Sequence, residues 1–285
     1  MHYQTLIDVK SVAAHLNDPS WLFVDCRAVL GKPEAGRELY LRDHIPGAVH
    51  ADLERDLTGD IVPGRTGRHP LPSQMAFDPA MSRLGVDAST QVIAYDELNG
   101  GMAAARLWWL LRWAGHDRVA VLDGGFSHWR DAGLPTRAGD ENRPPSTFRG
   151  CYRSEMVSNA GDTMQAAKSP GGRVIDSRAH DRYRGENEMV DPVAGHIPGA
   201  VNLPYGDNVT PDGRFLPPEE LRARFQSQAQ HQHANRPVFY CGSGVSAAQN
   251  ILAYVHAGFD MPHLYVGSWS DWITDPERPV AVGEG

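Results

Sequence analysis

Cysteine is scarce in this chain, and its few copies are scattered. Cys26, Cys151 and Cys241 are far apart among 285 residues and form no CxxC pair. Such a pattern argues against a disulfide framework or a structural zinc site, so we expect a reducing, cytoplasmic setting. An HExxH motif is also absent, and His231 and His233 lie in a polar, Gln-rich stretch typical of a solvated loop. We therefore predict that the protein binds no metal.

Positive charge is also in short supply. The chain has 27 Lys and Arg against 35 Asp and Glu, which gives a formal net charge of −8. Binding to nucleic acid is driven by an excess of basic side chains, so we expect no nucleic-acid partner. An anionic substrate would have to be attracted by a local cluster of positive charge.

The sequence has no long hydrophobic run. Its most apolar stretch, residues 107–111, lies between Arg106 and Arg112 and is far too short to span a membrane. Residues 1–8 lack the basic and apolar regions of a signal peptide. We expect no association with a membrane.

The chain does contain a long internal repeat. Four short blocks occur twice, in the same order and at a nearly constant separation. The paired blocks are residues 21–27 and 173–178, 43–49 and 195–201, 92–96 and 238–241, and 122–129 and 265–272. A repeat of this length indicates a duplicated domain.

Each half alternates short strand-like runs with helical stretches. This alternation is typical of the α/β class, with a parallel sheet flanked by helices in each half. A polar, Pro-rich stretch near residues 137–146 separates the halves. We predict domains at residues 1–138 and 161–285, joined by a linker at residues 139–160.

One stretch carries candidate chemistry. The strand-like residues 237–240 lead into Cys241, and residues 247–255 have a helical pattern. Gly242 and Gly244 allow a tight turn whose N–H groups, at the start of a helix, stabilise a thiolate or a sulfur anion. This favours a nucleophilic Cys241. The alternative is a buried structural cysteine beside a turn.

The same loop limits the chemistry. Cysteine phosphatases hold their phosphoryl dianion with Cys-x5-Arg, but the sixth residue after Cys241 is Ala247. Phosphate-ester and arsenate chemistry is therefore disfavoured. In the first half the matching residue is Asp96, which cannot act as a sulfur nucleophile, so we predict that this half is catalytically inactive.

These motifs together resemble the two-domain rhodanese family of sulfurtransferases. The resemblance extends from about residue 8 to residue 279 and rests on the paired Asp-x-Arg and His-Ile-Pro-Gly-Ala blocks, the helix at residues 106–109, and the Cys-Gly-Ser-Gly-Val-Ser loop. It implies tandem rhodanese-like domains, an inactive first domain and a cysteine persulfide intermediate. Within this family a neutral loop is typical of the 3-mercaptopyruvate sulfurtransferases, whereas thiosulfate-preferring members have Arg and Lys there.

The resemblance also implies the roles of individual residues. Arg182 matches an arginine that binds the substrate carboxylate. A second arginine of the family, nine residues on, is Asp191 here, and Arg184 is a candidate to replace it. The persulfide would be held by the N–H groups of the loop. The loop residues in question are Gly242, Gly244, Val245 and Ser246.

Ser243 matches a serine that works with a histidine and a carboxylate in the mercaptopyruvate enzymes. The corresponding first-half residues are His69 and Glu54, so we predict a relay in which Glu54 orients His69 and a proton passes through Ser243. Alternatively, His69 fixes its own loop and Glu54 is a solvated acid.

The sequence thus predicts sulfur transfer from 3-mercaptopyruvate through Cys241 to cyanide or to a thiol, either thioredoxin or a small thiol, with no bound cofactor. Thiosulfate is a compact dianion and would profit from fixed charge that Gly242 and Ser243 do not supply. Two alternatives remain: a thiosulfate:cyanide sulfurtransferase and a sulfur-carrier or binding module without turnover.

Overall fold

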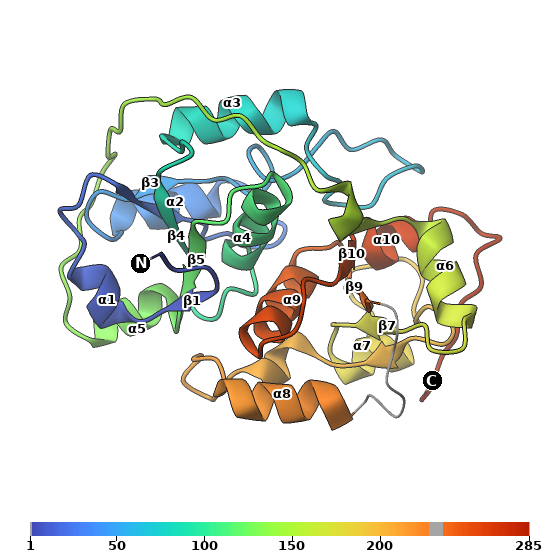
Figure 1. Ribbon diagram of the computed structural model, residues 1–285. Coiled ribbons are helices and arrows are strands. Elements are labelled where there is room, and N and C mark those ends of the chain that lie inside the picture. The colour runs from blue at the N-terminus through green and yellow to red at the C-terminus, as the bar shows by residue number, and fades with distance from the viewer. Residues whose placement is uncertain (1, 228–235, 285) are drawn as a thin grey trace. The chain divides into compact units, whose positions relative to one another are not determined.

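The computed structural model describes residues 2–227 and 236–284, which form two compact units (Figure 1). Unit 1 consists of the chain up to Gly59, Leu71–Arg153 and Val209–Phe215. Unit 2 consists of Asp60–Pro70, Ser154–Asn208 and the chain from Leu216 onward. Each unit therefore includes a short segment that comes from the other half of the sequence. His231 and His233 lie outside the described residues.

Unit 1 contains a five-stranded parallel sheet. In chain order its strands are β1 (Leu6–Ile7), β2 (Trp21–Asp25), β3 (Val49–His50), β4 (Gln91–Tyr95) and β5 (Val119–Leu122). Their order across the sheet is β1-β5-β4-β2-β3. Strands β2 and β4 are buried along their whole length, as expected of central strands that are covered on both faces.

Unit 2 repeats this sheet. Its strands are β6 (Val157–Ser158), β7 (Val174–Asp176), β8 (Val201–Asn202), β9 (Val238–Tyr240) and β10 (His263–Tyr265). They are parallel and arranged β6-β10-β9-β7-β8, the order found in unit 1. The predicted fold class, a duplicated α/β domain with a parallel sheet in each copy, is confirmed.

Helices surround both sheets (Figure 1). In unit 1 they are α1 (Val9–Ala13), α2 (Ala35–Arg42), α3 (Gln74–Leu84), α4 (Ala104–Trp113) and α5 (Gly125–Asp131). Helix α3 begins at the cap Ser73, whose side chain accepts from the Ala76 N–H, and ends at Gly85 in the left-handed conformation. Helix α4 packs on β4 and β5, and Trp108 and Trp109 of this helix are fully buried.

In unit 2 the helices are α6 (Ala160–Lys168), α7 (His180–Arg184), α8 (Pro218–Ser227), α9 (Ser246–His256) and α10 (Ser268–Trp272), with 3-10 turns η1 (Ser154–Met156) and η2 (Tyr205–Asn208). A capping box between Asn159 and Asp162 begins α6. Helix α9 packs on β9 and β10, and α8 contacts α9. In residues 2–227 and 236–284, every helix is too short or too polar to cross a membrane.

The repeated sequence blocks have structural roles in both units. Arg27 pairs with Asp25 and Arg178 with Asp176, each at 2.7 Å and fully buried. A buried ion pair of this kind is favourable only when hydrogen bonds complete it, and each guanidinium makes further bonds to backbone oxygens. The blocks therefore define the scaffold in both copies rather than chemistry specific to one.

Candidate functional site

Cys241 lies where the sequence places it, between the end of β9 and the start of α9. Its side chain is buried, and its Sγ accepts a hydrogen bond from the Gly244 N–H at 3.2 Å. Gly244 has a φ of +80°, a conformation that favours glycine and turns the N–H inward. No side chain caps α9, whose N-cap residue is Val245 and whose first residue is Ser246. The sulfur thus lies against the positive end of an uncapped helix.

The turn before α10 holds the Cys241 backbone in place. The Cys241 N–H donates to Ser268 Oγ at 3.1 Å, and the Cys241 oxygen accepts from Trp269 N at 3.0 Å. Ser268 has a φ of +54°, whereas the matching residue of the repeat, Gly125, has +61°. A non-glycine residue in this region is strained, and such strain occurs at functional sites where other contacts hold it.

Sequence reasoning missed Ser268. The signal was present in the repeat, because aligning residues 122–129 with 265–272 puts a serine opposite Gly125. A serine at a position where the other copy needs glycine indicates a hydroxyl with a specific partner. That partner is the Cys241 N–H.

Ser243 and His69 are in direct contact. His69 Nδ1 lies 2.7 Å from Ser243 Oγ, and both side chains are buried. The two residues are 174 positions apart in the chain, but both belong to unit 2, because the Asp60–Pro70 segment folds into it. The contact allows a proton to pass between the serine hydroxyl and the imidazole.

Glu54, the third member of the predicted relay, belongs to unit 1. It is exposed, and its backbone N–H donates to Asp52 Oδ1 at 2.8 Å. Its role in orienting His69 stays a prediction.

Two arginines converge on Gly242, the residue after the cysteine. A Cβ at this position would lie 2.9 Å from Arg68 Nη2 and 3.6 Å from both Nη atoms of Arg182. A side chain at this position would displace the Arg68 guanidinium, so glycine permits the approach. Arg182 is a predicted site residue, whereas Arg68 was missed, although it directly precedes His69 in the sequence.

Asp191 joins these arginines. Its Oδ1 accepts from Arg68 Nη1, and its Oδ2 accepts from Arg182 Nη2 at 3.1 Å. Burial raises the pKa of the Asp191 carboxyl above its usual value, and Arg68 opposes that shift more strongly than Arg182 does. Arg184, the predicted replacement for the second arginine, pairs instead with Glu186 at 2.9 Å and with Glu284 at 3.3 Å. Its role at the site stays a prediction.

The corresponding loop of unit 1 holds its own anion. Asp96 Oδ1 accepts from Gly100 N at 2.9 Å, and Oδ2 accepts from Met102, Ala103 and Ala104 N at 3.1 to 3.3 Å. The carboxylate therefore fills the space at the start of α4 that corresponds to the cysteine loop at the start of α9. Burial raises the pKa of Asp96, although the four N–H groups act against the shift.

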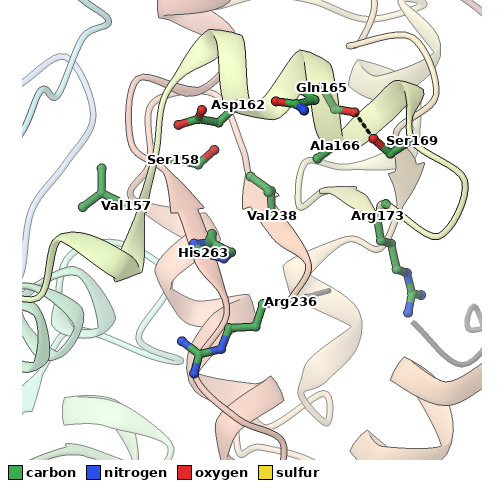
Figure 2. A pocket seen from close by; sticks show the side chains of 11 residues that line it. Val157, Ser158, Asp162, Gln165, Ala166, Ser169, Arg173, Arg236, Val238 and His263 are labelled. Carbon is green, nitrogen blue, oxygen red and sulfur yellow. Dashed lines mark hydrogen bonds between the residues drawn. The ribbon is translucent and has the colours of Figure 1, made fainter. Parts of the chain in front are cut away.

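A pocket of about 270 Å³ lies at the other end of the unit 2 sheet (Figure 2). Asp162 and Gln165 line it from α6, while Val238 and His263 are the first residues of β9 and β10. Cys241 follows the last residue of β9, so this pocket is separated from the cysteine by the length of the strand. Its lining, drawn from the described residues, includes none of the predicted site residues. No group of three or more His, Cys, Asp or Glu that could hold a metal ion occurs in the part of the chain that the structure describes.

The fold and the loop define a class of protein. The model of the rhodanese-like domain matches residues 8–132 and 159–275, which is most of the chain. The chain belongs to the rhodanese family, with two copies of the domain. The family predicted from the sequence is confirmed.

Similar proteins narrow this class. A protein of Pseudomonas aeruginosa, named as a probable 3-mercaptopyruvate sulfurtransferase, is 45% identical over 280 residues, which is 98% of each chain. The thiosulfate sulfurtransferase of Mus musculus is 32% identical, covering 99% of this chain and 97% of its own. A solved structure of the 3-mercaptopyruvate sulfurtransferase from Leishmania major has a TM-score of 0.82 and 32% identity, covering 97% of this chain and 75% of that one.

Proposed function

We propose that the protein is a sulfurtransferase that takes sulfane sulfur from 3-mercaptopyruvate and carries it as a persulfide on Cys241. The observation that carries the proposal is the setting of the Cys241 sulfur, which is buried, bonded to the Gly244 N–H and placed against the start of α9. A persulfide anion in this loop would be stabilised by the same Gly244 N–H and by the uncapped start of α9. The relatives named as 3-mercaptopyruvate sulfurtransferases support the choice of donor.

In the first half-reaction the Cys241 thiolate attacks the sulfur of 3-mercaptopyruvate. The new S–S bond forms as the C–S bond breaks, and the bonding electrons leave with the carbon as the enolate of pyruvate. His69 then supplies a proton to Ser243 across their 2.7 Å contact, and the Ser243 hydroxyl passes a proton to that carbon. The products are pyruvate and the Cys241 persulfide.

In the second half-reaction an acceptor attacks the outer sulfur of the persulfide. A thiolate forms an S–S bond to that sulfur and displaces the Cys241 thiolate, whereas cyanide takes the sulfur as thiocyanate. We propose a thiol acceptor, either thioredoxin or a small thiol. We also propose that the protein works in the cytoplasm. The first domain would end at residue 138 and the second would begin at residue 161, with residues 139–160 as the linker.

A second donor is supported by one feature of the site. Arg68 and Arg182 bring two guanidinium groups to Gly242, and positive charge beside the cysteine favours a dianion such as thiosulfate. The thiosulfate sulfurtransferase of Mus musculus is also similar along the whole chain. The persulfide step would be the same, with sulfite as the leaving group.

Sulfur transfer from the two donors tests the proposal, with cyanide as the acceptor. The wild type should release pyruvate from 3-mercaptopyruvate and turn over thiosulfate more slowly. The Cys241→Ser variant should lose about 10⁴-fold or more of both activities, because an alcohol does not form the persulfide. Cys151→Ser changes an exposed cysteine and serves as the matched control. Turnover that survives in Cys241→Ser would refute the persulfide mechanism.

A further inference from the structure

We infer that Arg68 is the second guanidinium that binds the carboxylate of the donor, beside Arg182, and that Asp191 holds the two arginines together. This inference rests on the proposed function and names the substrate-binding side of the same site. It assigns a role to a segment of the first half of the sequence, Asp60–Pro70, which folds into unit 2.

The two guanidinium groups meet at one point. Arg68 Nη2 and both Nη atoms of Arg182 lie 2.9 to 3.6 Å from the position that a Cβ of residue 242 would occupy. Gly242 directly follows the cysteine, so this point is close to the reacting sulfur. Two guanidinium groups that converge on one point form a typical carboxylate site.

The spacing of the donor fits this arrangement. In 3-mercaptopyruvate three bonds separate the sulfur from the carboxyl carbon, as many as separate consecutive Cα atoms, so the extended distance is about 4 Å. A donor whose sulfur contacts Cys241 can therefore place its carboxylate near the next residue along the chain. The side chains of Arg68 and Arg182 approach at that residue.

Each arginine is held from its other side. Arg182 donates from Nε and Nη2 to the two carboxylate oxygens of Glu188, at 3.0 and 2.8 Å. Asp191 accepts from Arg68 Nη1 and from Arg182 Nη2, and its side chain is only 1% exposed. Of the three guanidinium nitrogens near Gly242, Arg182 Nη2 is bonded to Glu188 and Asp191, whereas Arg68 Nη2 and Arg182 Nη1 take no part in the contacts to these two acids.

The charges explain why an acid at position 191 is compatible with an anionic donor. The negative charges of Glu188 and Asp191 offset the repulsion between the guanidinium groups of Arg68 and Arg182, which can then lie side by side. A carboxylate at position 191 therefore positions two cations. Asp191 stands where the family has its second arginine, and Arg68 supplies the second positive charge in its place.

The test compares two donors on the full-length protein. The first is 3-mercaptopyruvate, and the second is 1-mercaptopropan-2-one, which keeps the mercapto ketone and lacks the carboxylate. Arg68→Gln should lower kcat/KM for 3-mercaptopyruvate about 10- to 100-fold, mostly through KM, because it removes a hydrogen bond between charged groups. The rate with 1-mercaptopropan-2-one should stay near that of the wild type. Arg65→Gln, an exposed arginine of the same segment, is the control.

The outcomes separate this inference from the proposed function. An equal loss of kcat/KM with both donors would overturn the role of Arg68, and so would no loss with either donor. In both cases the effect of Arg68→Gln would not depend on the carboxylate of the donor. If the wild type itself forms no persulfide with 3-mercaptopyruvate, the proposed function fails first, and mass spectrometry of Cys241 detects that case directly.

Discussion

Ser243 and His69 show how one contact assigns roles at the scale of single residues. The serine hydroxyl and the imidazole meet at 2.7 Å, two residues along from Cys241, the proposed nucleophile, and both side chains are buried. A carbon leaving group requires a proton, whereas sulfite leaves as a stable anion. In the proposed mechanism the pair is therefore needed for 3-mercaptopyruvate more than for thiosulfate.

Replacing Ser243 should separate these donors. Ser243→Ala is expected to lower kcat for 3-mercaptopyruvate about 10²-fold, the contribution of a positioned general acid. Transfer from thiosulfate should stay near the wild-type rate, because its leaving group needs no proton. Steady-state rates of both reactions measure the difference, with the exposed Ser154→Ala as the control. Equal losses with both donors would show that Ser243 supports the loop rather than the proton transfer.

At the scale of elements, the two strand–loop–helix segments have the same architecture but hold different chemical groups. In unit 1 the loop between β4 and α4 holds the Asp96 carboxylate on four backbone N–H groups. In unit 2 the loop between β9 and α9 holds the Cys241 sulfur on the Gly244 N–H. The Asp96 carboxylate accepts hydrogen bonds from the N–H groups of its own loop, so the first loop has a structural role.

Removing the Asp96 carboxylate should destabilise the protein. Asp96→Ala leaves four N–H groups without their acceptor, and we expect a loss of about 2 to 4 kcal/mol in the free energy of unfolding. Denaturant titration at neutral pH measures the loss, and the exposed Asp131→Ala should lie close to the wild type. An unchanged midpoint in Asp96→Ala would contradict the assignment.

The same variant should also change the dependence of stability on pH. Burial raises the pKa of Asp96 above its usual 3.8, so the folded state binds this proton more tightly than the unfolded state does. The stability that Asp96 contributes is greatest at low pH and declines as the pH rises through its folded-state pKa. The deficit of Asp96→Ala should therefore grow as the pH is lowered from neutral.

At the scale of the whole molecule, the exchange of short segments decides which residues reach the site. The Asp60–Pro70 segment leaves the first half of the sequence and becomes part of unit 2, where it contributes Arg68 and His69. Its position is fixed at Gly67, where a Cβ would lie 2.5 Å from the Gly267 oxygen and 2.7 Å from Ser270 Oγ. The Arg68 N–H also donates to Ser270 Oγ at 3.0 Å.

Displacing this segment should affect activity more than folding. Gly67→Ala forces the segment away from backbone atoms, and a shift of about 1 Å in Arg68 and His69 is expected to cost about 10²-fold in kcat/KM for 3-mercaptopyruvate. Circular dichroism should show an unchanged secondary structure. Gly206→Ala is the matched control, because no atom lies within 4 Å of its new Cβ. Full activity in Gly67→Ala would show that the segment does not position the site.

Much of the fold could be predicted because its signals are local or repeated. Neighbouring residues alone reveal the hydrophobic runs of β2 and β9 and the helical pattern after residue 246. The duplicated blocks are visible when the two halves of the sequence are compared. Cys241 could be found for the same reason, since a strand, a Gly-containing loop and a helix follow one another in the chain. Arg68 could not, because its role depends on partners that are distant in sequence. Ser268 left a signal only in the comparison of the two repeats, and its partner, the Cys241 N–H, is visible only in the structure.

The sequence by itself determined the duplicated α/β fold, the cysteine at the start of a helix and the aspartate in the matching loop. Hydrophobic periodicity and turn chemistry are properties of short stretches, and they specify such features directly. The pairing of His69 with Ser243 was expected only from the family resemblance, and the tertiary structure brings the two side chains to 2.7 Å. Only the tertiary structure decided that Arg68 joins Arg182 beside Gly242. Those contacts follow from the folding of Asp60–Pro70 into unit 2, which depends on long-range packing that no local pattern records.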